Sequence, residues 1–130
     1  MVETQRGLVI LTLGDLIERS LDSLAAERKR LVQQAQGGRL SADAMRTPTF
    51  TLSNIGTGHV DFFTAIISPP QVAILSVGSI QPRPLVLNSQ LVVRPSVNLV
   101  LGADHRAIDG REAAGFLECL KAHLESGTFG

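Results

Sequence analysis

Two continuous apolar runs constrain the fold of this chain more than any other feature. Residues 7–13 read GLVILTL and residues 71–80 read QVAILSVGSI. Apolar runs without alternation predict strands that are buried on both faces, inside sheets that other elements cover. The first run begins almost at the start of the sequence, so the neighbouring strands that it needs are not evident before it.

A long amphipathic helix is predicted directly after the first run. Asp15 is expected to cap its N-terminus, and apolar residues then recur at three- and four-residue steps as far as Ala35. Gly37 and Gly38 match the usual C-terminal end of a helix. One further helical turn is expected over residues 41–45, before Pro48.

The second half of the chain predicts several strands and a closing helix. Residues 49–53 alternate polar and apolar, as in a strand with one buried face. Residues 85–87 and 91–93 resemble a hairpin around Asn88-Ser89, and residues 96–101 form another strand before a helix over 111–125. This order favours an α/β fold, a two-layer sandwich of mixed β-sheet and helices.

Composition excludes several classes of function. The 130 residues fit one domain, and 12 basic residues balance 12 acidic residues, so no excess of positive charge favours nucleic-acid binding. No apolar window has the roughly 20 residues of a transmembrane helix, and no membrane partner is expected. The single cysteine, Cys119, fits a reducing compartment and predicts a cytoplasmic location.

The corner between residues 104 and 110 is the first candidate site. An apolar strand leads into Asp104-His105-Arg106, and Asp109 follows four residues after the histidine. Imidazole takes up and returns protons near neutral pH, so His105 is a candidate general base that Asp109 orients. Alternatively, Asp109 is a helix N-cap that holds a polar corner, and His105 is a surface residue.

Ser53 is the second candidate, because it ends a half-buried strand beside a glycine-containing loop. Its hydroxyl suits a nucleophile or a hydrogen-bond donor to a developing oxyanion. The alternative is a serine that caps its own turn. A Ser-His-Asp hydrolase is also consistent with these residue types, although Ser53 lies outside a G-x-S-x-G elbow.

Three other side chains do not form a recognisable metal site. His59 lies in the glycine-containing loop, while Cys119 and His123 lie in the closing helix. Their spacing matches neither paired C-x-x-C nor H-x-x-x-H patterns, so no metal is expected.

Four blocks resemble the catalytic domain of dihydrolipoamide acyltransferases, the E2 components of 2-oxo acid dehydrogenase complexes. Residues 104–110 (DHRAIDG) resemble the DHRxxDG motif of this family. Residues 49–56 (TFTLSNIG), 68–75 (SPPQVAIL) and 6–9 (RGLV) resemble further blocks. The resemblance extends from about Val2 to Glu125. Residues 1–130 are thus expected to be the C-terminal portion of such a domain, without lipoyl or subunit-binding domains.

The resemblance implies a fold like chloramphenicol acetyltransferase, with active sites between neighbouring subunits of a trimer. It implies acyl transfer between dihydrolipoamide and coenzyme A. His105 would be the general base that deprotonates the attacking thiol. Ser53 would donate a hydrogen bond to the oxyanion, and Asp109 would hold the loop, by a charge-paired contact to an arginine, and orient His105.

The same resemblance implies the partners. Coenzyme A is a substrate, and a separate domain or protein presents the lipoyl group. A lipoyl domain, the E1 and E3 components and further copies of the chain in a trimer-based oligomer are the expected partners. A competing interpretation is a truncated, non-catalytic core that acts in assembly.

Overall fold

The computed structural model describes residues 2–4 and 7–127 and divides the chain into two compact units. The first unit comprises the residues up to Thr49 together with those from Phe116 onward, and the second comprises Phe50–Gly115. Over the described ranges, no helix is both long enough and apolar enough to cross a membrane.

In the first unit, β1 (Val2–Thr4) and β2 (Gly7–Val9) form an antiparallel pair in which Val2 faces Val9. The predicted strand over residues 7–13 is therefore too long, and its expected neighbour does precede it in the chain. From residue 10 the backbone is extended without a ladder, and the Thr12 amide donates to the Ala44 carbonyl at 3.0 Å. Beyond Val9 the segment is therefore bonded to the residues around η2 (Asp43–Met45) and not to a strand.

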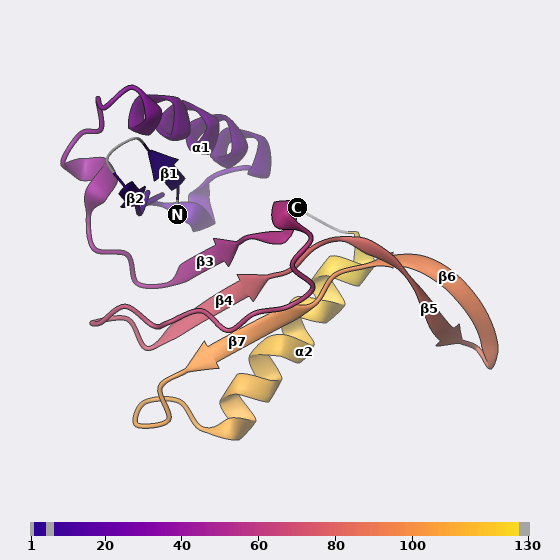
Figure 1. Ribbon diagram of the computed structural model, residues 1–130. Helices are drawn as coiled ribbons and strands as arrows, with labels where there is room; N and C mark the ends of the chain where they lie inside the picture. The colour runs from indigo at the N-terminus through magenta and orange to yellow at the C-terminus, as the bar shows by residue number, and fades with distance from the viewer. Residues whose placement is uncertain (1, 5–6, 128–130) are drawn as a thin grey trace. The chain divides into compact units, whose positions relative to one another are not determined.

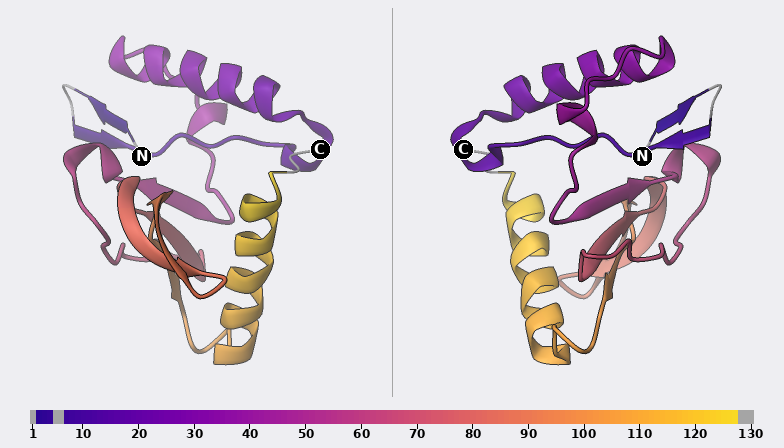
Figure 2. Two further views of the ribbon diagram at one scale, coloured as in Figure 1. Left: turned by 90° about the vertical axis from the view of Figure 1, so that its right-hand side faces the viewer. Right: turned by 90° about the vertical axis from the view of Figure 1, so that its left-hand side faces the viewer.

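The long helix of the first unit begins later than predicted. A 3₁₀ turn, η1 (Leu16–Glu18), precedes α1 (Leu21–Gln36), and Ser20 caps α1 by accepting from the Ser23 amide. Asp15 has a φ of 54° and makes no side-chain cap. The C-terminal end agrees with the prediction, because Gly37 is the C-cap. Figure 2 shows α1 and the β1–β2 pair in two views.

The second unit is built on a mixed three-stranded sheet in the order β3-β4-β7 (Figure 1). β3 is parallel to β4, and β4 is antiparallel to β7. The predicted strand over residues 71–80 is confirmed as the buried central strand β4, although the strand is shorter and covers only Ala73–Val77. The strands are β3 (Thr51–Asn54), β4 (Ala73–Val77) and β7 (Leu99–Ala103).

The buried face of β3 is the polar one. Thr51 and Ser53 are buried, while the Leu52 side chain between them is 57% exposed. The Thr51 hydroxyl donates to the Gln71 side-chain oxygen at 2.6 Å, so this hydroxyl has a hydrogen-bond partner although it is buried. The alternation of polar and apolar residues predicted the strand. Which face of the strand is buried depends on the segment between β3 and β4, residues 55–72, which contacts this face through Gln71.

A long hairpin links β4 to β7. It consists of β5 (Gln81–Leu87) and β6 (Gln90–Ser96), and Asn88 and Ser89 form its turn with φ values of 50° and 63°. Positive φ at both turn residues is the type I′ geometry that suits the twist of a hairpin. The predicted hairpin is confirmed and is longer than expected, because Pro82, Pro84 and Pro95 lie within paired strands.

The closing helix α2 (Gly110–Ser126) confirms the prediction over residues 111–125. Short 3₁₀ turns at η2 (Asp43–Met45) and η3 (Gly56–Gly58) complete the elements. Helices together with mixed sheets agree with the predicted α/β class.

Candidate functional site

The corner at residues 104–109 is a tight turn that begins where β7 ends. The Asp104 amide donates to the Val72 carbonyl at 2.8 Å, which extends the β4–β7 pairing by one bond. The amides of Ala107 and Ile108 then donate to the Asp104 carbonyl at 2.9 and 3.0 Å. These bonds fix the backbone on both sides of His105.

The side chain of His105 lies at the surface of this turn. It is exposed and makes no hydrogen bond to any residue in 2–4 or 7–127. Its neighbour Asp104 faces Arg106 instead, and Arg106 Nη2 lies 2.6 Å from Asp104 Oδ2. The Arg106 side chain and backbone N–H lower the pKa of Asp104 to about 2. The imidazole is therefore free to meet a partner from outside the chain.

Asp109 caps α2. Its Oδ1 accepts from the amides of Arg111 and Glu112 at 2.8 and 2.9 Å, and Glu112 Oε2 accepts from the Asp109 amide at 2.9 Å. This reciprocal arrangement is a capping box. Within the described residues Asp104 binds Arg106, and Asp109 satisfies the amides of the first helical turn, so the expected charge pair between Asp109 and an arginine stays a prediction.

Ser53 is buried, with an exposed fraction of 3%, yet its hydroxyl makes no hydrogen bond to a residue of the described ranges. Its neighbours on the same sheet face differ in this respect. Thr51 donates to Gln71, and the Ser76 hydroxyl accepts from the Ala65 amide at 3.2 Å. Ser53 thus keeps a donor that the fold of one chain does not use.

Ser53 and His105 lie toward opposite ends of the sheet. Ser53 pairs with Ser76, and Ser76 pairs with Val100 near the start of β7. His105 follows the far end of β7, so the two side chains are separated by more than about 10 Å along the strand direction. A Ser-His-Asp triad within one chain is therefore excluded.

The two other imidazoles are engaged locally or exposed. His123 Nδ1 lies 2.8 Å from the Cys119 carbonyl oxygen and 3.6 Å from the Cys119 sulfur. His59 is exposed at a positive φ of 59°. Among the residues that the structure describes, no three His, Cys, Asp or Glu side chains gather as metal ligands.

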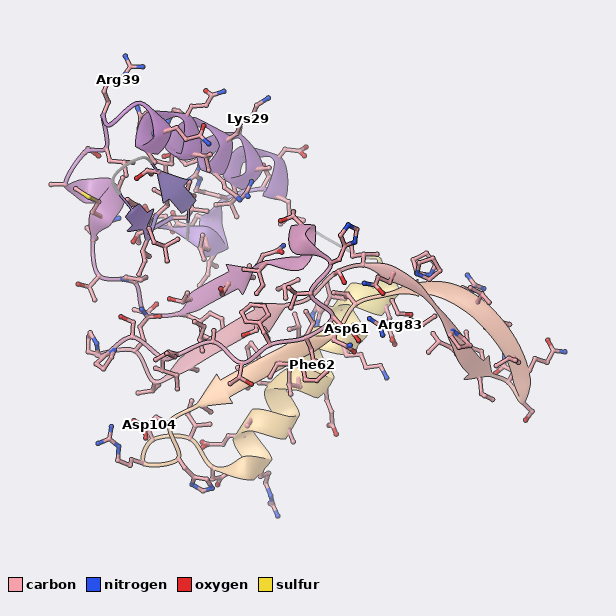
Figure 3. All side chains as sticks on the ribbon, in the orientation of Figure 1. Lys29, Arg39, Asp61, Phe62, Arg83 and Asp104 are labelled. Atoms are coloured by element: carbon pink, nitrogen blue, oxygen red, sulfur yellow. The ribbon has the colours of Figure 1, made fainter. Side chains whose placement is uncertain are left out.

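An acidic residue that the sequence did not single out binds three donors near the Ser53 end of the sheet. Asp61 accepts from both terminal nitrogens of Arg83 and, at 3.0 Å, from Asn98 Nδ2. Figure 3 shows Asp61 beside Arg83, with Asp104 at the other end of β7. The one signal in the sequence is a lone carboxylate in an otherwise apolar stretch, VDFF at residues 60–63.

Comparison with known proteins gives one consistent family. The model of the 2-oxoacid dehydrogenases acyltransferase (catalytic domain) family matches residues 1–128. The dihydrolipoyllysine-residue succinyltransferase component of the 2-oxoglutarate dehydrogenase complex of Haemophilus influenzae is 41% identical over 127 residues, which are 98% of this chain and 31% of that protein. The chain thus spans about a third of the length of this curated relative.

Solved structures of similar proteins confirm the expected fold class. Dihydrolipoamide acetyltransferase of Azotobacter vinelandii superposes with a TM-score of 0.86 at 37% identity, over 95% of this chain and 51% of that one. The cubic core of the pyruvate dehydrogenase multienzyme complex gives 0.86 at 36% identity, with the same coverage. The Azotobacter study concerns a serine, a histidine 52 residues later and an asparagine four residues after that, in the catalytic mechanism of that enzyme.

Proposed function

Because the chain belongs to the family of 2-oxoacid dehydrogenase acyltransferase catalytic domains, we propose that it transfers an acyl group between the dihydrolipoamide thiol and coenzyme A. One observation carries this proposal. Ser53, His105 and Asp109 keep the separations of 52 and four residues found between the serine, histidine and asparagine of the Azotobacter acetyltransferase. Asp109 replaces the asparagine at the third position.

The proposed chemistry needs one base and one donor. His105 takes the proton from the thiol of coenzyme A, and the thiolate attacks the thioester carbonyl carbon. The carbonyl oxygen becomes an oxyanion that accepts a hydrogen bond from Ser53. When the intermediate collapses, the bond from carbon to the dihydrolipoamide sulfur breaks, and that sulfur takes the proton from His105. Thiols ionise near pH 8.5, so a neutral imidazole is a suitable base.

We propose that each site lies between two copies of the chain. Ser53 and His105 point to this arrangement, because they lie toward opposite ends of one sheet although the mechanism needs both at one carbonyl group. The exposed, unpartnered imidazole of His105 supports the same conclusion. A trimer-based oligomer places the histidine of one copy beside the serine of the next. Coenzyme A and the lipoyl group enter as substrates, and no metal takes part.

The proposed partners follow from the family. A separate lipoyl domain presents the acyl group, and the E1 and E3 components complete the reaction cycle. We keep a cytoplasmic location as a prediction that rests on the single cysteine.

A second candidate function is a non-catalytic core that acts in assembly. The burial of Ser53 favours this candidate, because a hydroxyl in a residue that is only 3% exposed has little room to reach a substrate. The two candidates share the fold and the oligomer, and they differ in turnover.

Acyl transfer from acetyl- or succinyl-dihydrolipoamide to coenzyme A tests the proposal. We expect His105→Ala to lower kcat by about 10² to 10⁴, the usual contribution of a general base, and Ser53→Ala to lower it by about 10² to 10³. His123→Ala is the control, since His123 is an imidazole of α2 that has no role in the proposed chemistry. If the wild-type chain turns over no faster than His105→Ala, the proposed acyl transfer is refuted and the non-catalytic role in assembly remains.

A further inference from the structure

The connection between the parallel strands β3 and β4 returns across the sheet face that carries Ser53. Parallel strands need such a crossover, and here residues 55–72, the crossover segment, provide it with only one 3₁₀ turn. The Ala65 amide donates to the Ser76 hydroxyl, and Gln71 accepts from Thr51. Since Ser76 is the direct partner of Ser53, this segment covers the face on which the Ser53 hydroxyl lies.

The start of the crossover segment packs on backbone rather than on side chains. Gly56 lies so close to the Gly78 carbonyl that a Cβ at Gly56 would collide with it, and a Cβ at Gly78 would collide with the Asp61 carbonyl. The Ser79 amide also donates to the Val60 carbonyl at 2.8 Å. The backbones of Gly56, Gly78 and Asp61 are therefore closely stacked on one another. This backbone stack begins at Gly56, three residues after Ser53 in the sequence.

Side-chain bonds of Asp61 secure this stack from two directions. Its carboxylate accepts from Nη1 and Nη2 of Arg83 in β5 and from Nδ2 of Asn98, which precedes β7. Asn98 is itself tied to the stack, because its carbonyl accepts from the Gly78 amide at 3.0 Å. Hydrogen bonds with Arg83 and Asn98 keep the pKa of Asp61 below its usual range. The carboxylate is therefore ionised throughout the neutral range.

We propose that Asp61, through Arg83 and Asn98, is a positioning residue that holds the crossover segment over Ser53 and so sets the access and direction of its hydroxyl. The part concerning acyl transfer rests on the function proposed above. The structural part stands without it. No bond of Asp61 reaches Ser53, so the carboxylate acts only through the segment that it anchors.

Reactivity of a thiol placed at position 53 tests the structural part. The starting protein carries Ser53→Cys together with Cys119→Ser, which removes the exposed native thiol. We expect slow modification by a maleimide, and an increase in rate of about tenfold or more when Asp61→Asn is added, because charge-assisted bonds that hold the closed segment are lost. Arg83→Lys, which keeps the charge but not the paired donors, should give an intermediate rate.

Glu27→Gln is the matched control, since Glu27 forms a similar pair of hydrogen bonds with Arg30 in the first unit. It should leave the modification rate unchanged. Equal rates with and without Asp61→Asn would overturn the proposal. If Ser53→Cys does not fold, amide exchange of Ala65 and Ser79 in the otherwise native chain replaces it. Faster exchange at both amides in Asp61→Asn supports the anchoring role, and unchanged exchange overturns it.

Kinetics test the functional part. Asp61→Asn should lower kcat by about tenfold and leave the KM for coenzyme A within about twofold. In a Ser53→Ala background the same substitution should have no further effect on kcat, because the residue acts through Ser53. Full additivity of the two substitutions would overturn the positioning role. A chain without turnover would refute the proposed function alone, since thiol reactivity or amide exchange still decides whether Asp61 holds the segment.

Discussion

Asp109 stabilises the first turn of α2 and thereby fixes the direction in which the chain leaves the His105 corner. We predict that Asp109→Ala lowers the free energy of unfolding by about 1 kcal/mol, since its carboxylate accepts from two amides that would lose their partner. Asp109→Asn should change it by only a few tenths, because asparagine is an equally good N-cap. Urea unfolding of both variants measures this, and equal losses would contradict the capping role.

Asp104 makes the corner sensitive to acid. Its pKa of about 2 lies below the ordinary value of 3.8 because Arg106 binds the ionised form. The stabilisation is therefore complete above about pH 4 and is lost as the pH falls toward 2. We expect wild type and Asp104→Asn to differ in unfolding free energy at pH 6 and to converge near pH 2. Because Arg106 is 90% exposed, added salt should shrink the difference. A difference that persists below pH 2 would rule out this linkage.

At the scale of elements, the end of β4 depends on a backbone approach that only glycine permits. We predict that Gly78→Ala destabilises the chain by at least about 2 kcal/mol, because the added methyl group collides with the Asp61 carbonyl. Gly115→Ala in α2 is the matched control, and it should stabilise by about 0.5–1 kcal/mol, since nothing lies within 4 Å of the new Cβ and alanine favours helix. Thermal unfolding compares the two, and a neutral Gly78→Ala would show that the stack is loose.

At the scale of the whole molecule, the β5–β6 hairpin has apolar surface to bury. Val86 and Leu91 are cross-strand partners with exposed fractions of 72% and 75%, and a two-stranded sheet is only marginally stable alone in water. The proposed oligomer would cover this surface. We predict that Val86→Thr and Leu91→Ser each weaken self-association about tenfold or more, because burying such a side chain is worth about 1.5–3 kcal/mol.

Sedimentation equilibrium measures that association. Ser89→Gly is the control within the same hairpin, because it relieves a positive φ of 63° and leaves the apolar surface in place. It should not weaken the oligomer. Association that is the same in wild type and in the variant with both substitutions would show that the hairpin lies outside the interface.

Local pattern was sufficient for several elements. The unbroken apolar run predicted the buried strand β4, Asn88-Ser89 predicted a hairpin turn, and the three- to four-residue periodicity predicted the first long helix. Each of these predictions uses a feature that is visible within a few residues of sequence, namely an unbroken apolar run, a turn dipeptide or a helical period. The pairing of β1 with β2 was missed, because it depends on a second segment, Val2–Thr4, rather than on the apolar run itself.

The sequence by itself determined the candidate residues, since His105, Ser53 and Asp109 were identified from residue types and motif resemblance. Only the tertiary structure decided their geometry. Strand register separated Ser53 from His105, the crossover segment buried the polar face of β3, and the first turn of α2 engaged Asp109. Register and coverage depend on contacts between residues far apart in the chain, so no local pattern encodes them.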